Sequence, residues 1–550
     1  MKNFDVAIIG FGPVGATAAN MFAKSGFNII VVESKFDIWD IPRAVHFDGQ
    51  TQRIFQSMGI MDQIDKIIDP ATEVKFLDAK GKELIHLGGM NEGYQLNGYV
   101  EDVFFNQPKF EKILRDNAKK YENIDLKLGY ELINLEANDG INNLKIVNSS
   151  SEESFTAKYV LGCDGADSFI RKSLKIESHD FNCDQDWVVA DYLVDEKYSI
   201  EDRCRYQICD YKRPTTLLPI TENHVRWEFM IKPDDDISNM ENESTIRNLM
   251  EPHLWRLNPQ ITKESGTLLR SSKYTFHGLL AKDFKYKNCF LIGDAAHQTP
   301  PFLGQGLCQG IKDAYNLVWK INGIDKHHYS KKILDTYTIE RSEVVTFAIE
   351  TAIKQQNIIA SQSMIKSFLR DLFLRTAAFF PKLLSFLSFS YPWNYSNGII
   401  DNNLYPNDVN GIIIPQPNLK LRVNDLPFDQ YIGDEFALLL FKCDHVFLEK
   451  INSLSNLPKN FIDVERDNSP NRYRMFHPYL NSDGSLITHS ESPLIKINIC
   501  SELEWVIDGG FHHSNEKDFE GNFWIPSWSF PINTKGINCL LYTSPSPRDS

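Results

Sequence analysis

A glycine-rich segment near the N-terminus constrains the fold of this chain more than any other feature. Residues 10–15 read Gly-Phe-Gly-Pro-Val-Gly, which is the pattern G-x-G-x-x-G. This segment follows a short apolar strand pattern at residues 6–9 and opens a helix pattern of small residues at about 13–24. A second strand pattern, at residues 27–32, completes a strand–helix–strand unit. Such units form parallel sheets with right-handed crossovers, so the sequence predicts an α/β fold.

Each glycine of this first motif has a physical task in binding a dinucleotide. Gly10 permits a tight turn, Gly12 lets a pyrophosphate approach the backbone, and Gly15 lets the helix pack closely against the strand. Glu33 ends the second strand, where its carboxylate can accept hydrogen bonds from ribose hydroxyls and would repel a 2′-phosphate. We therefore predict a Rossmann-type domain that binds the adenosine end of FAD or NAD at this motif. The predicted contacts are Gly10, Gly12, Pro13, Val14, Gly15 and Glu33.

In two later motifs, an apolar strand pattern also ends at a glycine and an aspartate. The second motif, at residues 160–171, contains Asp164, and on its own it is equally typical of a hairpin turn. The third motif runs from residue 289 into Asp294, then through a Pro-Pro loop and a glycine-rich approach to a helix pattern. Backbone amides at such a helix start can face an anionic or carbonyl-rich ligand, and Asp294 can hydrogen-bond a polyol. The candidate contacts of the third motif are Asp294, Pro301, Gly304, Gln305, Gly306 and Leu307.

Together the three motifs resemble the signature of the single-component, FAD-dependent aromatic hydroxylases, also called group A flavoprotein monooxygenases. The resemblance covers roughly residues 4–390. In that family the first motif holds the ADP half of FAD, the second serves both FAD and NAD(P)H, and the third holds the ribityl chain. Residues 42–44 and 107–108 resemble two further flavin-contacting segments. The resemblance therefore implies FAD contacts from Arg43, Gln107 and Asp164.

Within that family the chain most resembles the 3-(3-hydroxyphenyl)propionate and 3-hydroxycinnamate hydroxylases. The segments that carry this closer resemblance are residues 187–191, 213–216, 226–230, 274–277 and 304–308. The resemblance implies hydroxylation of a phenolic aromatic acid in aromatic catabolism, with NADH or NADPH, O₂ and a flavin C4a-hydroperoxide. A flavoenzyme of the same fold with other chemistry, such as a reductase, an epoxidase or a polyketide hydroxylase, is the alternative. A non-catalytic FAD-binding protein is a third reading.

The implied reaction needs side chains that can ionise a phenol and hold its acidic group. The candidates for acid–base work or for hydrogen bonds to the substrate are Tyr274, His277, His46 and Asp48. Tyr274 and His277 could equally be a core aromatic residue and a buried, satisfied histidine. Arg213 or Arg226 could anchor a substrate carboxylate, although both could equally form surface ion pairs.

Changes in composition along the chain predict its domains. The expected parts are a discontinuous FAD-binding domain (residues 1–177 and 275–390), a mixed-sheet substrate domain (178–274), a Pro/Asn-rich linker (391–417), a smaller C-terminal domain (418–541) and a disordered tail (542–550). The C-terminal domain resembles a thioredoxin-like domain, but Cys443 stands alone there and cannot form a dithiol centre. The tail resembles translated adapter read-through rather than native sequence.

Charge and cysteine content limit the partners. The chain has 58 Lys+Arg against 73 Asp+Glu, a net charge of −15, which argues against general binding of nucleic acid. No 18-residue apolar run occurs, so we expect no membrane span. The nine cysteines form no C-x-x-C pair, which favours a reducing, cytoplasmic location. His297 lacks a companion at metal-ligand spacing, so no metal is expected, whereas a homodimer is left open.

Overall fold

A parallel sheet organises the N-terminal part of the chain, as the first motif predicts. Its strands are β1 (Lys2–Ile9), β2 (Ile29–Glu33), β8 (Ile124–Leu128), β9 (Glu131–Glu136), β10 (Asn142–Val147), β11 (Glu152–Gly162), β19 (Lys285–Tyr286) and β20 (Cys289–Leu291). The order is β19-β20-β11-β1-β2-β8, with β10 and β9 as an antiparallel extension beside β11. β1 pairs in parallel with both β11 and β2, so the first and second motifs end at the same edge of the sheet. The predicted α/β, Rossmann-type fold is confirmed.

The computed structural model describes residues 2–377, except residues 41, 72, 89–96 and 201–202, and several short strands between residues 438 and 542. Its chain divides into one compact unit of residues 1–391 and 397–399 and a second of residues 392–396 and 400–550.

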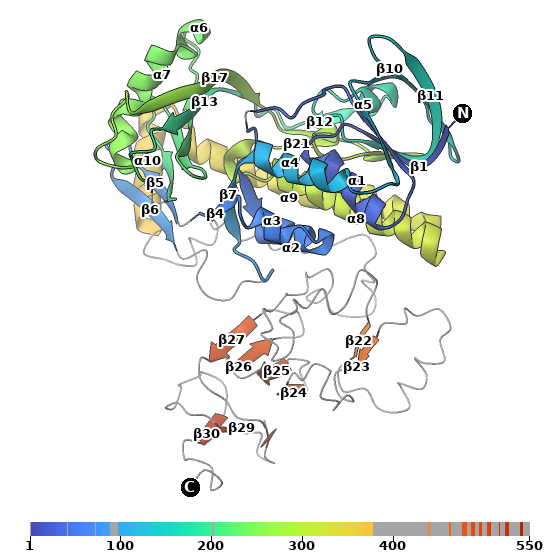
Figure 1. Cartoon of the computed structure of the whole chain (residues 1–550). Helices are drawn as coiled ribbons and strands as arrows, with labels where there is room; N and C mark the ends of the chain where they lie inside the picture. Colours follow the sequence, from blue (N-terminus) through green and yellow to red (C-terminus); the bar gives the residue numbers. More distant parts are fainter. Residues whose placement is uncertain are drawn as a thin grey trace. The chain divides into compact units, whose positions relative to one another are not determined.

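Helices pack against the parallel sheet and against one another. They are α1 (Pro13–Lys24), α2 (Gly49–Met58), α3 (Met61–Ile64), α4 (Gln107–Ala118), α5 (Phe169–Ser173), α6 (Ile237–Met240), α7 (Glu243–Met250), α8 (Gly306–His327), α9 (Thr336–Ile359) and α10 (Met364–Ala377). Short 3₁₀ turns are η1 (Glu251–Arg256), η2 (Gly293–Ala295), η3 (Pro301–Leu303) and η4 (Lys331–Asp335). The helix α1 lies against α4 and α8 (Figure 1). Among the helices of the described residues, none is both long and apolar enough to cross a membrane.

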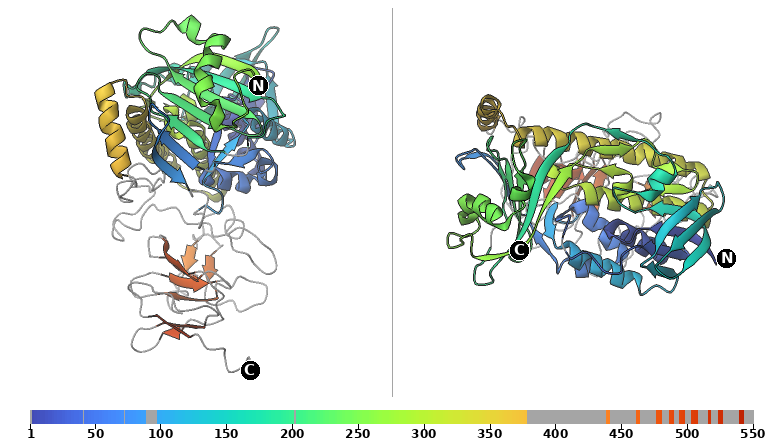
Figure 2. Two further views of the ribbon diagram at one scale, coloured as in Figure 1. Left: turned by 90° about the vertical axis from the view of Figure 1, so that its left-hand side faces the viewer. Right: turned by 90° about the horizontal axis from the view of Figure 1, so that it is seen from above.

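A seven-stranded sheet forms the other half of this unit. Its strands are β5 (Glu73–Leu77), β6 (Glu83–Gly88), β13 (Gln185–Val194), β14 (Arg205–Ile208), β15 (Thr215–Pro219), β16 (His224–Met230) and β17 (Gly266–Phe276). The order is β17-β13-β16-β15-β14-β5-β6, and α10 packs beside β6 (Figure 2). Because β5 pairs in parallel with β14, this sheet begins well before the predicted boundary at residue 178. The sequence pattern within residues 178–274 could not indicate that β5 and β6, from an earlier part of the chain, form the edge of this sheet.

The strand β16 explains why one face of the seven-stranded sheet is apolar and the other is polar. Successive side chains of a strand point to opposite faces. Val225, Trp227 and Phe229 are buried in a core with residues of α6 and α7. Arg226 and Glu228 therefore lie on the opposite face of the sheet. This polar face forms one wall of the candidate site.

Two small sheets complete the first unit, and short strands are described in the second. In the first they are β3 (His46–Asp48), β4 (Ile68–Pro70), β7 (Asp102–Phe105), β12 (Ser178–Asp180), β18 (Leu279–Ala281) and β21 (His297–Gln298). In the second they are β22 (Leu438–Leu440), β23 (Phe461–Asp463), β24 (Phe476–Leu480), β25 (Leu486–His489), β26 (Leu494–Ile497), β27 (Leu503–Ile507), β28 (Glu516–Lys517), β29 (Phe523–Pro526) and β30 (Cys539–Tyr542). The predicted linker and the tail after residue 542 lie outside the described residues. The thioredoxin-like likeness stays a prediction.

Candidate active site

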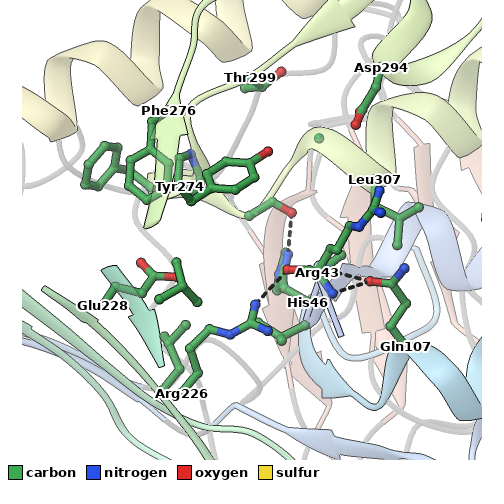
Figure 3. A pocket seen from close by; sticks show the side chains of 18 of the residues that line it. Arg43, His46, Gln107, Arg226, Glu228, Tyr274, Phe276, Asp294, Thr299 and Leu307 are labelled. Atoms are coloured by element: carbon green, nitrogen blue, oxygen red, sulfur yellow. Dashed lines mark hydrogen bonds between the residues drawn. The ribbon is translucent and has the colours of Figure 1, made fainter. Parts of the chain in front are cut away.

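A cavity of about 560 Å³ is lined by residues from both large sheets and from the loops that follow the motifs (Figure 3). The sequence-predicted residues that line it are Gly12, Pro13, Val14, Arg43, His46, Gln107, Tyr274, His277, Asp294, Pro301, Gly304, Gly306 and Leu307. The predicted residues outside this lining are Gly10, Gly15, Glu33, Asp48, Asp164 and Gln305. Segments that are far apart in the sequence thus meet around one space.

The glycines of the first motif divide into two kinds. Gly10 has φ +102°, and a Cβ there would lie 2.3 Å from the carbonyl oxygen of Cys163. A Cβ on Gly15 would lie 2.0 Å from the carbonyl oxygen of Gly10. The packing of the protein itself therefore demands these two glycines. A Cβ on Gly12, in contrast, would meet no atom within 4 Å, so Gly12 leaves open space beside the backbone for a ligand.

Glu33 ends β2 and fixes the loop of the first motif. Its Oε2 accepts a hydrogen bond from the N–H of Phe11 at 2.7 Å, and its Oε1 accepts one from the N–H of Lys35 at 2.8 Å. The hydroxyl of Ser34 also donates to Oε1 at 3.3 Å, so about one of the roughly four acceptor positions of this carboxylate is left for a ribose hydroxyl.

Gln107 holds the loop that carries Arg43. Its side-chain oxygen accepts hydrogen bonds from the N–H groups of Arg43 and Ala44, both at 2.7 Å. Its Nε2 donates to Glu111 at 2.7 Å. From the seven-stranded sheet, Arg226 donates to the carbonyl oxygen of Arg43 at 2.6 Å. The loop is thus pinned between α4 and β16 at the side of the cavity.

His46 is engaged at both ring nitrogens. Its Nε2 lies 2.9 Å from Oδ1 of Asp102, and its Nδ1 lies 3.2 Å from the carbonyl oxygen of Gly304. Burial alone would lower the pKa of His46, but the carboxylate of Asp102 outweighs it and raises this pKa to about 10. The ring is therefore a cation that donates on both sides. It ties β3 to Gly304, whose φ of +65° suits glycine.

Asp48 is also held in an ion pair. Its Oδ2 lies 2.6 Å from Nζ of Lys312, and its Oδ1 caps α2 by accepting from the N–H of Thr51 at 2.8 Å. Burial opposes ionisation, but Lys312 and Thr51 hold the pKa of Asp48 below its usual value. This arrangement fits a residue that anchors α2 against α8.

The third motif points Asp294 into the cavity. Asp313 of α8 accepts a hydrogen bond from the N–H of Gly293 at 3.0 Å and pairs with His297 at 2.8 Å and with Arg341 at 2.6 Å. Burial would raise the pKa of Asp313, but Arg341 and His297 lower it to about 2. The turn before Asp294 is thereby fixed, while the carboxyl of Asp294 is open to the cavity yet surrounded by protein, which raises its pKa.

This network also accounts for His297, whose Nε2 is paired with Asp313. Within the part of the chain that the structure describes, no group of three or more His, Cys, Asp or Glu side chains is arranged to hold a metal ion.

In the second motif, Asp164 accepts a hydrogen bond from the N–H of Ile170 at 3.0 Å. Its Oδ1 is buried without a partner among the described residues, and burial raises its pKa.

Tyr274 and His277 lie toward the open part of the cavity. Tyr274 is 57% exposed, and its ring contacts that of Phe276. His277 is partly exposed, and its Nδ1 lies 2.9 Å from Oδ1 of Asp184. The phenol hydroxyl of Tyr274 can therefore meet a ligand, whereas one nitrogen of His277 is already occupied.

The sequence pointed to Arg226 but not to the charged cluster that surrounds it on the polar face of the seven-stranded sheet. Asp191 is buried, and its oxygens lie 3.0 Å from His224 Nε2, 3.0 Å from Arg226 Nε and 2.8 Å from Arg270 Nη2. Burial opposes its charge, but Arg226 and His224 drive the pKa of Asp191 well below its usual value. Arg213, in contrast, pairs with Asp235 and is not part of the cavity lining.

Glu228 is a further cavity residue that was not among the candidates predicted from the sequence. It is 9% exposed and lines the cavity. Burial raises the pKa of its carboxyl to about 7, against the opposing positive charge of Arg226. The available signal was a run of charged residues at alternate positions of an otherwise aromatic strand, Arg226-Trp227-Glu228-Phe229. Such alternation predicts one polar and one apolar face of the strand, but it does not show that the polar face is buried.

The residues present fit FAD. Open space lies beside the backbone of Gly12 and of Gly306 at the start of α8, where a Cβ would meet no atom within 4 Å. Asp294 offers acceptors to the same cavity, and Thr299 lines it with an Oγ1 that is buried without a partner among the described residues. Phosphates bind at helix starts with exposed N–H groups, and polyols bind carboxylates and hydroxyls. The cavity therefore suits a dinucleotide with a polyol chain.

Comparisons with known proteins agree with this reading. Residues 3–352 match the family model described as "FAD binding domain". The 3-(3-hydroxy-phenyl)propionate/3-hydroxycinnamic acid hydroxylase of Burkholderia cenocepacia (strain HI2424) is 29% identical over 444 residues, which cover 80% of this chain and 79% of the relative. The hydroxylase of the same name from Escherichia coli (strain SMS-3-5 / SECEC) is 27% identical over 468 residues, covering 84% and 82%.

Solved structures share the fold. A ternary complex of aklavinone-11 hydroxylase with FAD and aklavinone has a TM-score of 0.69 at 18% identity, covering 92% of this chain and 96% of that chain. The p-nitrophenol 4-monooxygenase from Pseudomonas putida DLL-E4 has a TM-score of 0.61 at 21% identity, covering 71% and 99%. The family match spans more than half of the chain. This protein therefore belongs to the FAD binding domain family, and its predicted resemblance to the FAD-dependent aromatic hydroxylases is confirmed.

Proposed function

We propose that the protein is a monooxygenase that uses FAD, NADH or NADPH, and O₂ to hydroxylate a small phenolic acid at the carbon next to its hydroxyl. The observation that best supports this proposal is that one cavity combines the glycine and aspartate residues that fit FAD with a positively charged wall. The names of the curated relatives support the same substrate class. When bound, FAD supplies the redox chemistry and the activation of O₂, which side chains cannot supply.

The three motifs would share the binding of FAD. We assign the pyrophosphate to the start of α1 at Gly12, Pro13 and Val14, and the ribose to Glu33. Asp294 would hold the ribityl chain, and residues 301–307 with Arg43 and Gln107 would border the ring system. Gly10, Gly15 and Asp164 act behind this lining by fixing the turns, and Gln305 supports the start of α8, where its Oε1 accepts a hydrogen bond from Gln309 at 3.2 Å.

Charge in the cavity favours an acidic substrate. The guanidinium groups of Arg205, Arg226 and Arg270 line it, and they face the carboxylates of Asp102 and Asp191. The cation of His46 shares Asp102, so four positive charges face these two negative charges. Nε of Arg270 is buried without a hydrogen-bond partner among the described residues. We therefore assign the substrate carboxylate to Arg270 rather than to Arg213.

The other predicted acid–base residues receive distinct roles. Tyr274 would hydrogen-bond the substrate, because its hydroxyl is exposed in the cavity. His277, bound to Asp184, would close the same side against water. His46 and Asp48 would act as positioning residues, since their charges are already used in ion pairs. A volume of about 560 Å³, shared with part of FAD, suits a single ring better than a polycyclic substrate.

The test is to purify the protein, record the visible spectrum of FAD, and measure NADH and NADPH oxidation with and without 3-(3-hydroxyphenyl)propionate. The product is analysed for oxygen taken from ¹⁸O₂. Substrate-stimulated oxidation with one labelled oxygen in a catechol supports the proposal. Oxidation without labelled product supports a reductase of the same fold, and bound FAD without turnover supports a non-catalytic role. Either of the last two results would overturn the proposal.

A further inference from the structure

A row of side chains crosses the seven-stranded sheet on its cavity face. The pairing register aligns Ser272 of β17 with Val189 of β13, Val189 with Glu228 of β16, Glu228 with Thr216 of β15, and Thr216 with Gln207 of β14. All five residues line the cavity. Glu228 stands in the middle of this row and carries its only ionisable side chain.

Glu228 differs from the other charged groups near it because its carboxylate is not used. No hydrogen bond or ion pair to its side chain is found among the residues that the structure describes. Thr216 donates to Oε1 of Gln207 at 2.8 Å, so its proton is taken. Arg226, two positions earlier on the strand, is committed to Asp191 and to the loop at Arg43. A buried carboxyl without a protein partner is costly, and a ligand with a hydroxyl would compensate it.

Position separates Glu228 from the groups that fit FAD. Only two carboxyl groups line the cavity among the described residues, Glu228 and Asp294. In Figure 3, Glu228 lies with Arg226 beside the seven-stranded sheet, across the pocket from Asp294 and Leu307. Asp294 belongs to the third motif, which leaves Glu228 on the side where a substrate would lie.

We propose that Glu228 binds the hydroxyl of the aromatic substrate and removes its proton. The proposal rests on the proposed function, which supplies a phenol that must ionise before it is hydroxylated. In this step the O–H bond of the phenol breaks, the proton moves to one carboxylate oxygen of Glu228, and the bonding electron pair stays on the phenol oxygen. Glu228 is thus a catalytic residue that touches the substrate, and Tyr274 is left as a hydrogen-bond donor.

The electrostatic surroundings suit a base that works near neutral pH. Burial raises the pKa of Glu228 to about 7, Arg226 and Arg270 lower it, and Asp191 raises it. A general base is most effective when its pKa lies near the operating pH. Across the cavity, the cation of His46 also faces this space. The pKa of His46, which Asp102 raises to about 10, and the lowered pKa of Asp191 both lie away from neutral pH.

The experiment compares wild-type holoenzyme with Glu228→Gln and with the control Glu196→Gln. Glu196 is an exposed carboxylate just after β13, outside the cavity. Catechol formed and NAD(P)H consumed are measured from about pH 5 to about pH 9, and FAD content is measured in each variant. We expect Glu228→Gln to keep FAD but to lose about 10²–10⁴-fold in hydroxylation rate. The acid limb of the wild-type pH profile should be absent from Glu228→Gln and present in Glu196→Gln.

A more acidic substrate distinguishes a base from a residue that only supports the wall. A fluorinated analogue of the phenol ionises at lower pH without help, so the ratio of wild-type to Glu228→Gln rates should shrink. A ratio that stays the same for both substrates would overturn the proposal, and so would a Glu228→Gln enzyme with wild-type rate and pH profile.

A binding measurement keeps this proposal separate from the proposed function. 4-Nitrophenol is mixed with each holoenzyme below its own pKa, and its absorbance reports its ionisation without turnover. We expect the wild type and Glu196→Gln to bind it as the phenolate and Glu228→Gln to bind it as the neutral phenol. If the wild type ionises the probe but makes no catechol, the proposed function fails while the role of Glu228 stands. If the wild type does not ionise the probe, the role of Glu228 is wrong whatever the hydroxylation assay gives.

Discussion

Replacing Glu228 by Gln should stabilise the folded protein, and the gain should depend on pH. Burial raises the pKa of Glu228 from 4.5 to about 7, so the folded protein binds this proton more tightly than the unfolded chain. Because the unfolded chain binds fewer protons here, the free energy of unfolding falls as the pH rises from about 4.5 to about 7. A pKa difference of about 2.5 corresponds to roughly 3 kcal/mol at ~1.36 kcal/mol per pKa unit. Glu228→Gln removes this loss.

The assay is urea denaturation of the holoenzymes at saturating FAD, followed by FAD fluorescence, which reports the unit that contains the cavity. The free energy of unfolding of Glu228→Gln minus that of wild type should be small near pH 4.5, should grow to roughly 3 kcal/mol by about pH 7, and should then stay level. Glu196→Gln, at an exposed position, should show no such trend. A difference that is constant with pH, or a wild type that is more stable above pH 7, would refute the reasoning.

The remaining predictions concern other residues of the cavity and the ion pair behind His46. Asp294→Ala should yield mostly apoprotein in an FAD titration, since it removes hydrogen bonds worth about 1–3 kcal/mol. Arg270→Met should raise KM for the phenolic acid about 10-fold or more, but not for a phenol without the acid group, because an ionic hydrogen bond is worth about 1.5–3 kcal/mol. Tyr274→Phe should release more hydrogen peroxide per NAD(P)H while keeping FAD. Asp102→Asn should destabilise the fold by about 3–5 kcal/mol in urea denaturation, because it leaves His46 and Arg205 buried without their counter-ion.

The motif residues could be predicted because their demands are local. Gly10 needs φ +102°, and Gly15 must let α1 approach the preceding turn, so only glycine serves at both positions. Glu33 follows directly from the length of the strand–helix–strand unit, and it holds the loop of the first motif through Phe11. A few consecutive residues are enough to meet such requirements. The fold and the FAD side of the cavity are therefore visible in the sequence.

The substrate side could not be predicted in the same way, because it depends on pairing between distant segments. His46 is protonated because of Asp102, which reaches it only through the pairing of β3 with β7. Asp191 gathers Arg226 and Arg270 only because β13 lies between β16 and β17. In the sequence each of these residues is an isolated charge, which usually indicates a solvated surface. Their burial becomes visible only when the strand register is known.

The two sides of the cavity should differ in how they tolerate substitutions. Substitutions at the motif glycines disturb the turns that hold FAD, because a Cβ at Gly10 or Gly15 meets backbone atoms closer than 3 Å. Positions in the row around Glu228 face the cavity without taking part in those turns, since each belongs to a strand whose hydrogen bonds come from the backbone. Substitutions of Thr216 or Ser272 should therefore alter which phenol the enzyme hydroxylates, while the protein still binds FAD. Substitutions in the seven-stranded sheet can therefore change the substrate while the FAD site stays the same, because the two sides of the cavity come from different sheets.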